Sequence, residues 1–174
     1  MAIVQDPRGL MYFANKDGVL EYDGVSWRLI PTTNRTGVYS LAVDPSGQVF
    51  VGAQGEIGYL APDETGQLKF VSLKDRLEPA CQQFSEVLGA CSTSQGVYFY
   101  TRNFLFLFSS GRFTCWKAST TFHRSFSARD RFFIRQADLG LMEMKSGNLS
   151  LIPGGEKFAQ NRVDVVLPFG ADKF

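Results

Sequence analysis

The 174-residue sequence has little of what a metal or redox centre needs. It contains one histidine, His123, and three cysteines, Cys81, Cys91 and Cys115, none of which belongs to a Cys-x-x-Cys pair. One imidazole and three scattered thiols do not make the ligand set of a structural zinc site, so we expect neither a metal nor a cofactor. We predict that the cysteines are small buried hydrophobic residues, with a Cys81–Cys91 disulfide as the alternative.

A large excess of one charge and a long hydrophobic run are also missing. Eighteen basic and seventeen acidic residues leave a net charge of +1, so charge predicts no nucleic-acid partner. The longest apolar run, 104–108, is too short to span a bilayer. Met1 is not followed by a basic and then an apolar region, so we expect no targeting segment and no membrane segment in this sequence.

Aromatic residues, glycine and proline are abundant. Aromatic residues make up 14% of the chain and sixteen of them are Phe, a residue that favours strands. Seventeen Gly and seven Pro are spread along the sequence, as expected for many tight turns. This composition predicts an all-β protein.

Four similar segments recur along the chain, at 5–22, 43–60, 95–108 and 130–144. We align them on the aromatic residues Tyr12, Phe50, Phe99 and Phe133. Each segment contains two apolar stretches separated by a short turn, and each is followed by a Gly-containing turn and a closing strand. The predicted closing strands are Trp27–Ile30, Leu68–Leu73, Phe113–Trp116 and Leu149–Ile152.

Four short antiparallel strands in about forty residues are typical of a β-propeller blade. We therefore predict an incomplete β-propeller with blades at 1–31, 38–73, 84–117 and 122–153, and the start of a further blade at 162–168. Opening strands are expected at Val38–Val43, at Glu86–Cys91 and near Phe126, and Val163–Leu167 would open the further blade. The second strands are apolar at successive positions, so both of their faces must be covered, as happens between stacked blades. An irregular β-sandwich is the alternative.

The first two repeats carry a recognisable motif. Asp6 to Gly9 with Gly18 to Asp23, and Asp44 to Ala53 with Gly55 to Leu60, resemble the repeat of two-component regulator propellers, including those that precede a triple-tyrosine domain. The tryptophan that is usual in that repeat is replaced by the four aligned aromatic residues.

This resemblance implies an extracytoplasmic, periplasmic sensor domain of a histidine kinase or hybrid two-component regulator. Many such domains respond to glycans, and they usually have seven blades. The sequence itself contains no kinase histidine motif, receiver aspartate pattern or DNA-binding helix. We therefore expect a ligand-sensing segment that is not itself an enzyme.

Loop positions suggest a binding face. The turns at Asp6–Gly9 and Asp44–Gly47 are predicted to be structural, with Asp capping each turn. Ligands of propellers usually meet the loops between blades and the turns between second and third strands. In this chain those loops contain Asn15, Lys16, Arg35, Gln54, Arg102, Asn103, His123 and Gln136, whose amide and basic groups suit a glycan or another small ligand.

Two other functions remain open. A propeller glycoside hydrolase or lyase would need paired carboxylates, and the same loops contain the scattered acids Glu78, Asp138 and Glu156. A protein-interaction scaffold of the WD-repeat kind would carry Trp-Asp and Gly-His signatures, which are missing. The arginines at 124, 129, 131 and 135 are interpreted as charges that protect strand edges.

An open stack of blades has two end faces. We predict that both are apolar and bare, so that the chain self-associates or packs against the remaining blades of a larger propeller. Two copies closing an eight-bladed ring is one such arrangement.

Overall fold

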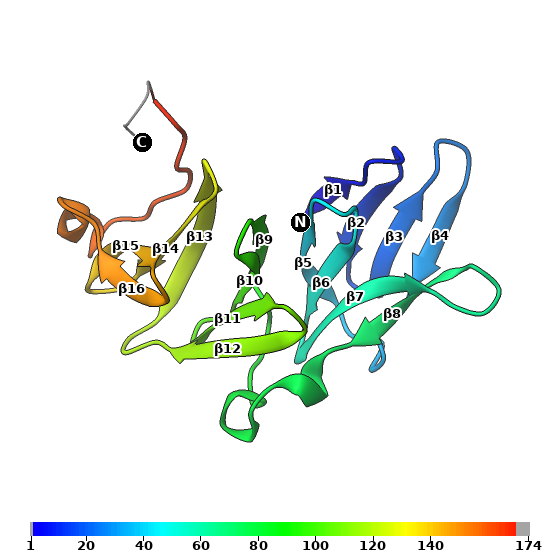
Figure 1. Cartoon of the computed structure of the whole chain (residues 1–174), viewed down its shortest axis with the longest axis horizontal. Helices are drawn as coiled ribbons and strands as arrows, with labels where there is room; N and C mark the ends of the chain where they lie inside the picture. The colour runs from blue at the N-terminus through cyan, green and yellow to red at the C-terminus, as the bar shows by residue number, and fades with distance from the viewer. Residues whose placement is uncertain (1, 170–174) are drawn as a thin grey trace.

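The computed structural model describes residues 2–169, in which sixteen strands form four antiparallel sheets (Figure 1). We call these sheets blades 1 to 4. Blade 1 contains β1 (Ile3–Gln5), β2 (Met11–Asn15), β3 (Gly18–Tyr22) and β4 (Trp27–Ile30); blade 2 contains β5 (Val38–Val43), β6 (Val49–Ala53), β7 (Glu56–Pro62) and β8 (Leu68–Ser72). Blade 3 contains β9 (Gly89–Thr93), β10 (Gly96–Tyr100), β11 (Phe104–Ser109) and β12 (Arg112–Lys117); blade 4 contains β13 (Phe122–Ala128), β14 (Arg131–Gln136), β15 (Gly140–Lys145) and β16 (Asn148–Leu151).

The strands of each blade pair in chain order, and the four blades stand side by side in an arc (Figure 1). The first strand of each blade lies on the inner side of the arc and the fourth lies on its outer rim. The arc is not closed. This arrangement confirms the predicted all-β, incomplete β-propeller and excludes the sandwich. No helix among residues 2–169 is long and apolar enough to cross a membrane.

All sixteen strands lie inside the predicted blade ranges. Met1, the first residue of the first range, lies outside the described residues. The third opening strand begins at Gly89, three residues later than expected, while the backbone N–H groups of Val87 and Leu88 donate to Ala53 and Tyr100 in the two flanking blades. The opening strand predicted at Val163–Leu167 is not formed. An opening strand needs the second strand of its own blade as a partner, and no such strand follows within the described residues. The assignment of 162–168 to a further blade stays a prediction.

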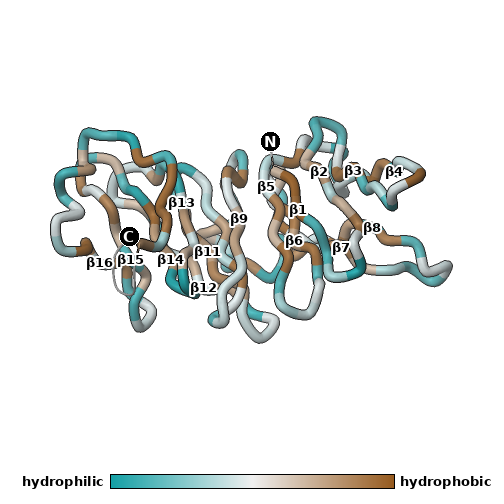
Figure 2. The backbone as a smooth tube through the Cα atoms, turned by 90° about the horizontal axis from the view of Figure 1, so that it is seen from above, coloured by the Kyte–Doolittle hydropathy of each residue, from teal (hydrophilic) through white to brown (hydrophobic). Residues whose placement is uncertain are grey.

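Hydrophobic cores lie between the blades. One core joins blades 1 and 2, another joins blades 2 and 3, and a third joins blades 3 and 4. Second strands supply both neighbouring cores at once: Tyr98 and Phe99 are each 1% exposed, yet they belong to different cores. Figure 2 shows the hydrophobic stretches within the strands and the hydrophilic ones in the connecting loops.

The structure corrects the alignment of the third repeat. Tyr12 and Phe50 each face the following blade, and Phe133 faces the outer side of blade 4. Phe99 instead faces the preceding blade, blade 2. The residue equivalent to the other three is Tyr98, which faces blade 4. A slip of one residue reverses the face because side chains alternate along a strand.

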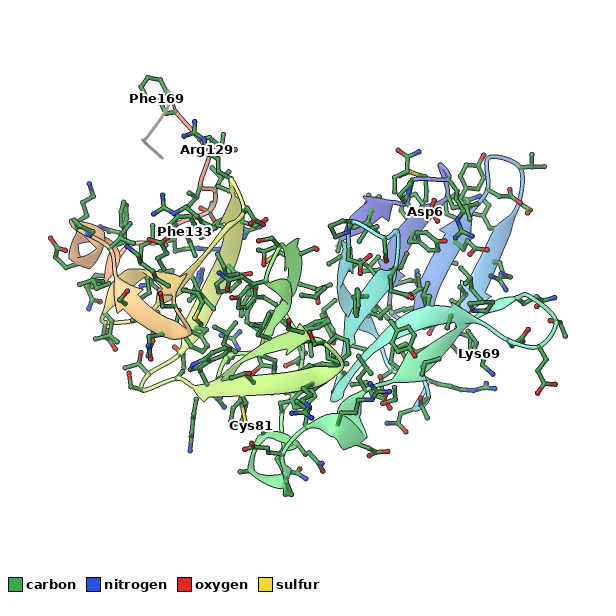
Figure 3. The ribbon with its side chains drawn as sticks, viewed as in Figure 1. Asp6, Lys69, Cys81, Arg129, Phe133 and Phe169 are labelled. Atoms are coloured by element: carbon green, nitrogen blue, oxygen red, sulfur yellow. A yellow bond between two sulfur atoms is a disulfide. The ribbon has the colours of Figure 1, made fainter. Side chains whose placement is uncertain are left out.

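The cysteine prediction is wrong for two of the three residues. Cys81 forms a disulfide with Cys115, not with Cys91, and the pair joins the link between blades 2 and 3 to β12 (Figure 3). This link contains two short 3₁₀ helices, η1 (Lys74–Arg76) and η2 (Pro79–Cys81), and packs its buried Leu77 into the same core as Cys81. Cys91 is a free, largely buried thiol, and burial raises its pKa to about 12.

The expectation of two bare end faces is wrong for blade 4. The 3₁₀ helix η3 (Gly155–Phe158) and Val166 pack against Phe133 and Leu141 on its outer face. On the same face, Arg131 forms a salt bridge with Glu143 at 2.6 Å. The chain thus covers this face with its own residues and with a charged pair. Both disfavour the packing of another blade on this face.

The outer face of blade 1 is apolar and uncovered. Ile3, Phe13, Leu20 and Leu29 lie directly opposite one another across the four strands. Next to this row, Trp27 is 57% exposed, and its ring centroid lies 4.5 Å from that of Tyr22 and 5.1 Å from that of Phe13. The corresponding faces of blades 2, 3 and 4 are each covered by the preceding blade.

We expect this face to drive self-association of the chain, because soluble monomeric proteins rarely expose a contiguous apolar sheet face to solvent. The apparent mass in sedimentation equilibrium should rise with protein concentration, and Leu29→Lys should suppress the rise. Leu139→Lys serves as the matched control, since Leu139 is 40% exposed on blade 4, away from this face. A wild-type chain that stays monomeric, or an equal effect of the two substitutions, would contradict this prediction.

Candidate ligand-binding rim

The two ends of the blades differ. At one end, which we call the turn end, lie the turns between first and second strands and between third and fourth strands. As predicted, aspartates cap the turns there: Asp6 Oδ1 accepts hydrogen bonds from the N–H groups of Arg8 at 2.9 Å and Leu10 at 3.1 Å. Asp44 accepts equivalent bonds from Ser46 and Gln48, both at 2.9 Å.

Asp6 also binds the Arg8 guanidinium and the Tyr12 hydroxyl. Burial opposes ionisation of Asp6, but the hydrogen bonds from the Arg8 guanidinium and from the backbone N–H groups of Leu10 and Arg8 outweigh it and hold the pKa of Asp6 below its ordinary value. Every bond made by this carboxylate is internal to blade 1, so its role is structural. The cavity beside it, of about 330 Å³, is a gap between blades 1 and 2 that Pro7, Arg8 and Gln48 line.

The opposite end, which we call the link end, contains the turns between second and third strands and the links between blades. All eight residues predicted from loop position lie at this end. Five of them are exposed, namely Lys16, Arg35, Gln54, Arg102 and Asn103. Asn15 and His123 are partly exposed, and Gln136 is buried. The structure thus places these residues on one rim. Ligand binding by them stays a prediction.

Backbone contacts hold the rim of blades 1 and 2 together. The Gln54 N–H donates to the Gly37 carbonyl at 3.0 Å, and Gly37 lies against the backbone of Lys16. Arg35 adopts a positive φ of 54° and lines a cavity of about 320 Å³ together with Asp17 and Leu29. This part of the rim therefore offers a basic and an amide side chain beside a partly apolar hollow.

A buried carboxylate, missed by the sequence analysis, lies just below this rim. Glu56 is 2% exposed, and its Oε1 accepts a hydrogen bond from the Asn34 side chain. Its Oε2 is buried and has no hydrogen-bond partner among the described residues. Burial raises the pKa of Glu56 above its ordinary value. Glu56 therefore keeps its proton up to a higher pH than an exposed Glu does.

On blades 3 and 4 the rim is more basic. The Phe122 N–H donates to the Arg102 carbonyl at 2.8 Å, which places Arg102 beside the start of β13. Gln136 is not available to a ligand. With its side-chain oxygen turned toward the link 118–121, it accepts hydrogen bonds from Ser119 Oγ at 2.8 Å and from the Thr120 N–H at 3.1 Å.

Two inner strands contain a bulge at the same place. The pairing register shifts between Val38 and Ser40 in β5 and between Phe122 and Arg124 in β13. The extra residues are Tyr39, which is 40% exposed, and His123. Bulges re-aim side chains and are common beside functional sites. Tyr39 therefore joins the rim as a candidate that loop position alone could not reveal.

His123 lies in a positively charged environment. Burial lowers its pKa, and the charges of Arg135, Arg162 and Arg102 lower it further. Its Nδ1 is buried and has no hydrogen-bond partner among the described residues. In residues 2–169 no three His, Cys, Asp or Glu side chains are grouped so that they could hold a metal.

No family model matches the sequence, and no curated protein matches it. Among solved structures, virginiamycin B lyase from Staphylococcus aureus superposes with a TM-score of 0.65 at 14% identity, covering 86% of this chain and 53% of that one. The WD40 propeller domain of Doa1 gives a TM-score of 0.62 at 13% identity, with 85% and 52% covered.

The extracellular domain of a proposed hybrid two-component system from B. thetaiotaomicron gives a TM-score of 0.63 at 18% identity. The alignment covers 86% of this chain but 24% of that domain. The chain thus spans about half of the first two structures and about a quarter of the third. At these identities the likenesses establish the propeller fold.

Proposed function

We propose that this chain is the ligand-sensing part of an extracytoplasmic, periplasmic propeller of a two-component receptor, and that its link end binds a glycan. The observation that carries the proposal is the gathering of exposed amide and basic side chains on one rim, above inner strands whose bulges contain the exposed Tyr39 and the partly exposed His123. The hydroxyl groups of a sugar bind such donors and acceptors, and the apolar C–H face of its ring stacks on an aromatic side chain.

Two further findings support this assignment. The motif at Asp6–Asp23 and Asp44–Leu60 resembles that of two-component regulator propellers, and the fold is shared with the extracellular domain of a proposed two-component system. The Cys81–Cys115 disulfide suits an oxidising compartment, since such bonds are rare where thiols are kept reduced.

A binding role suits the rim better than hydrolysis. The three acids predicted from loop position belong to different segments: Glu78 lies in the link between blades 2 and 3, whereas Glu156 follows blade 4. Asp138 is held by Gln160, whose Nε2 donates to its Oδ1 at 3.0 Å. Glycoside hydrolysis needs two carboxylates roughly 5–10 Å apart on one substrate.

Glycan binding to the intact chain tests this function. We expect an immobilised saccharide array to identify at least one bound glycan, and the double substitution Arg35→Ala, Gln54→Ala to weaken binding of ligands that reach blades 1 and 2. Lys69→Ala serves as control, since Lys69 is an exposed residue of β8 outside the rim. Absence of binding to any saccharide, or cleavage of a bound glycan, would overturn the proposal.

A further inference from the structure

We propose that Arg102, His123 and Arg124 form a subsite for the acidic group of a saccharide, and that Asp164 of the same chain occupies this subsite in the absence of ligand. The acidic group is a carboxylate or a sulfate ester. This inference rests on the proposed function and narrows its ligand to acidic saccharides.

Positive charge is concentrated at the link end of blade 4. Arg124 lies directly opposite Arg135 across the pair β13–β14. Arg102 is placed beside them by the hydrogen bond from the Phe122 N–H. Arg162, in the segment that follows η3, brings a fourth guanidinium, and its charge acts on His123 together with those of Arg102 and Arg135.

One of these arginines has a structural role. Arg135 is 7% exposed, and its Nε donates to the Phe158 carbonyl at 3.0 Å while its Nη2 donates to the Ala159 carbonyl at 2.5 Å. These bonds hold η3 against blade 4, and among residues 2–169 no acid forms a salt bridge with Arg135. Like charges directly opposite each other in a sheet are destabilising, so the Arg124–Arg135 pair favours the approach of an anion.

Asp164 supplies one carboxylate to this cluster. Its Oδ1 lies 3.2 Å from Nη1 of Arg124 and 3.8 Å from Nη2 of Arg162. The side chains of Arg124 and Asp164 are 50% and 66% exposed, so water reaches both partners. Exposed ion pairs of this kind contribute little to stability, and an external carboxylate can therefore displace Asp164.

The remaining donors are arranged for an anion larger than one carboxylate. Arg124 uses one guanidinium nitrogen for Asp164, and Arg102 forms no salt bridge within the described residues, although its charge also reaches Glu86. A guanidinium has five N–H donors and binds a carboxylate or sulfate through two of them. The exposed amide of Asn103, next to Arg102, is available to neighbouring sugar hydroxyl groups.

The bulge at His123 determines the side of the sheet on which Arg124 lies. Phe122 faces blade 3, whereas Arg124, two residues later, lies opposite Arg135 on the outer side of blade 4, where Asp164 meets it. The rim at blades 1 and 2 has the equivalent bulge at Tyr39, but there Lys16 already pairs with Asp17 at 3.4 Å. The acidic group is therefore assigned to blades 3 and 4.

The experiment measures binding of the intact chain to an array that holds both neutral and acidic saccharides, followed by titration with the best acidic member. We expect acidic members to bind, and the double substitution Arg102→Gln, Arg124→Gln to raise Kd about tenfold or more. Asp164→Asn should lower Kd about twofold to fivefold, because it removes the internal competitor. Arg112→Gln is the matched control, since Arg112 is an exposed arginine at the turn end.

The outcomes separate the two proposals. Binding of neutral saccharides alone, or acidic binding that the double substitution leaves unchanged, would overturn the acidic subsite and leave the proposed function standing. Failure of every saccharide to bind the wild-type chain would overturn both. All four substituted residues are largely exposed, so equal melting temperatures should accompany the changes in Kd.

Discussion

Replacing Cys115 with serine is expected to lower the free energy of unfolding by about 3–4 kcal/mol. The disulfide with Cys81 closes a loop across 34 positions of sequence, and its loss frees the unfolded chain to explore more conformations. In the folded state, the same bond holds the link between blades 2 and 3 against β12.

Urea unfolding with and without a reducing agent measures this effect. The wild-type chain should lose the same free energy on reduction that Cys115→Ser loses without it, and the substituted chain should be insensitive to the reductant. Cys91→Ser is the control, because Cys91 forms no disulfide. Equal unfolding midpoints for oxidised and reduced wild-type protein would contradict the prediction.

Substituting Tyr98 with alanine is expected to cost about 3–5 kcal/mol, the usual range for deleting a buried aromatic side chain. The Tyr98 ring stacks on Phe132 of blade 4, with centroids 4.1 Å apart and planes inclined by 20°. Its hydroxyl donates to Gln95 Oε1 at 2.7 Å. The substitution therefore opens a cavity between blades 3 and 4 and removes their ring contact.

Two control substitutions assign this cost to packing. Tyr98→Phe keeps the ring and should cost about 1 kcal/mol, the usual contribution of one hydrogen bond. Trp27→Ala removes a larger ring from the uncovered face of blade 1 and should cost less than Tyr98→Ala when measured at low protein concentration. A loss below about 1 kcal/mol for Tyr98→Ala would contradict the role of this contact in joining the blades.

Much of the fold follows from local patterns in the sequence. The strand lengths, the Asp-capped turns at Asp6 and Asp44 and the runs that are apolar on both faces indicate stacked four-stranded blades. The position of the link-end loops could also be predicted, because alternating strand directions place every second connection at the same end of a blade. Eight candidate residues were found in this way, although Gln136 proved to be buried.

Other features depend on turn geometry that the pattern does not reveal. The first two strands are joined by residues 6–10 in blade 1 and 44–48 in blade 2, but by Ser94 and Gln95 alone in blade 3. A shorter turn changes the register, and a change of one residue exchanges the two faces of the strand. For this reason Tyr98, and not Phe99, is the counterpart of Tyr12.

The proposed acidic subsite and the disulfide depend on tertiary structure alone. Asp164 meets Arg124 forty positions earlier because η3 turns the chain back over blade 4. Cys81 meets Cys115 because the 73–88 link packs against the outer strand of blade 3. Local sequence determines which strands form, since hydrogen bonding and side-chain alternation act over a few residues. Which residues meet across blades depends on how the links pack, and that packing is set by cores assembled from distant segments of the chain.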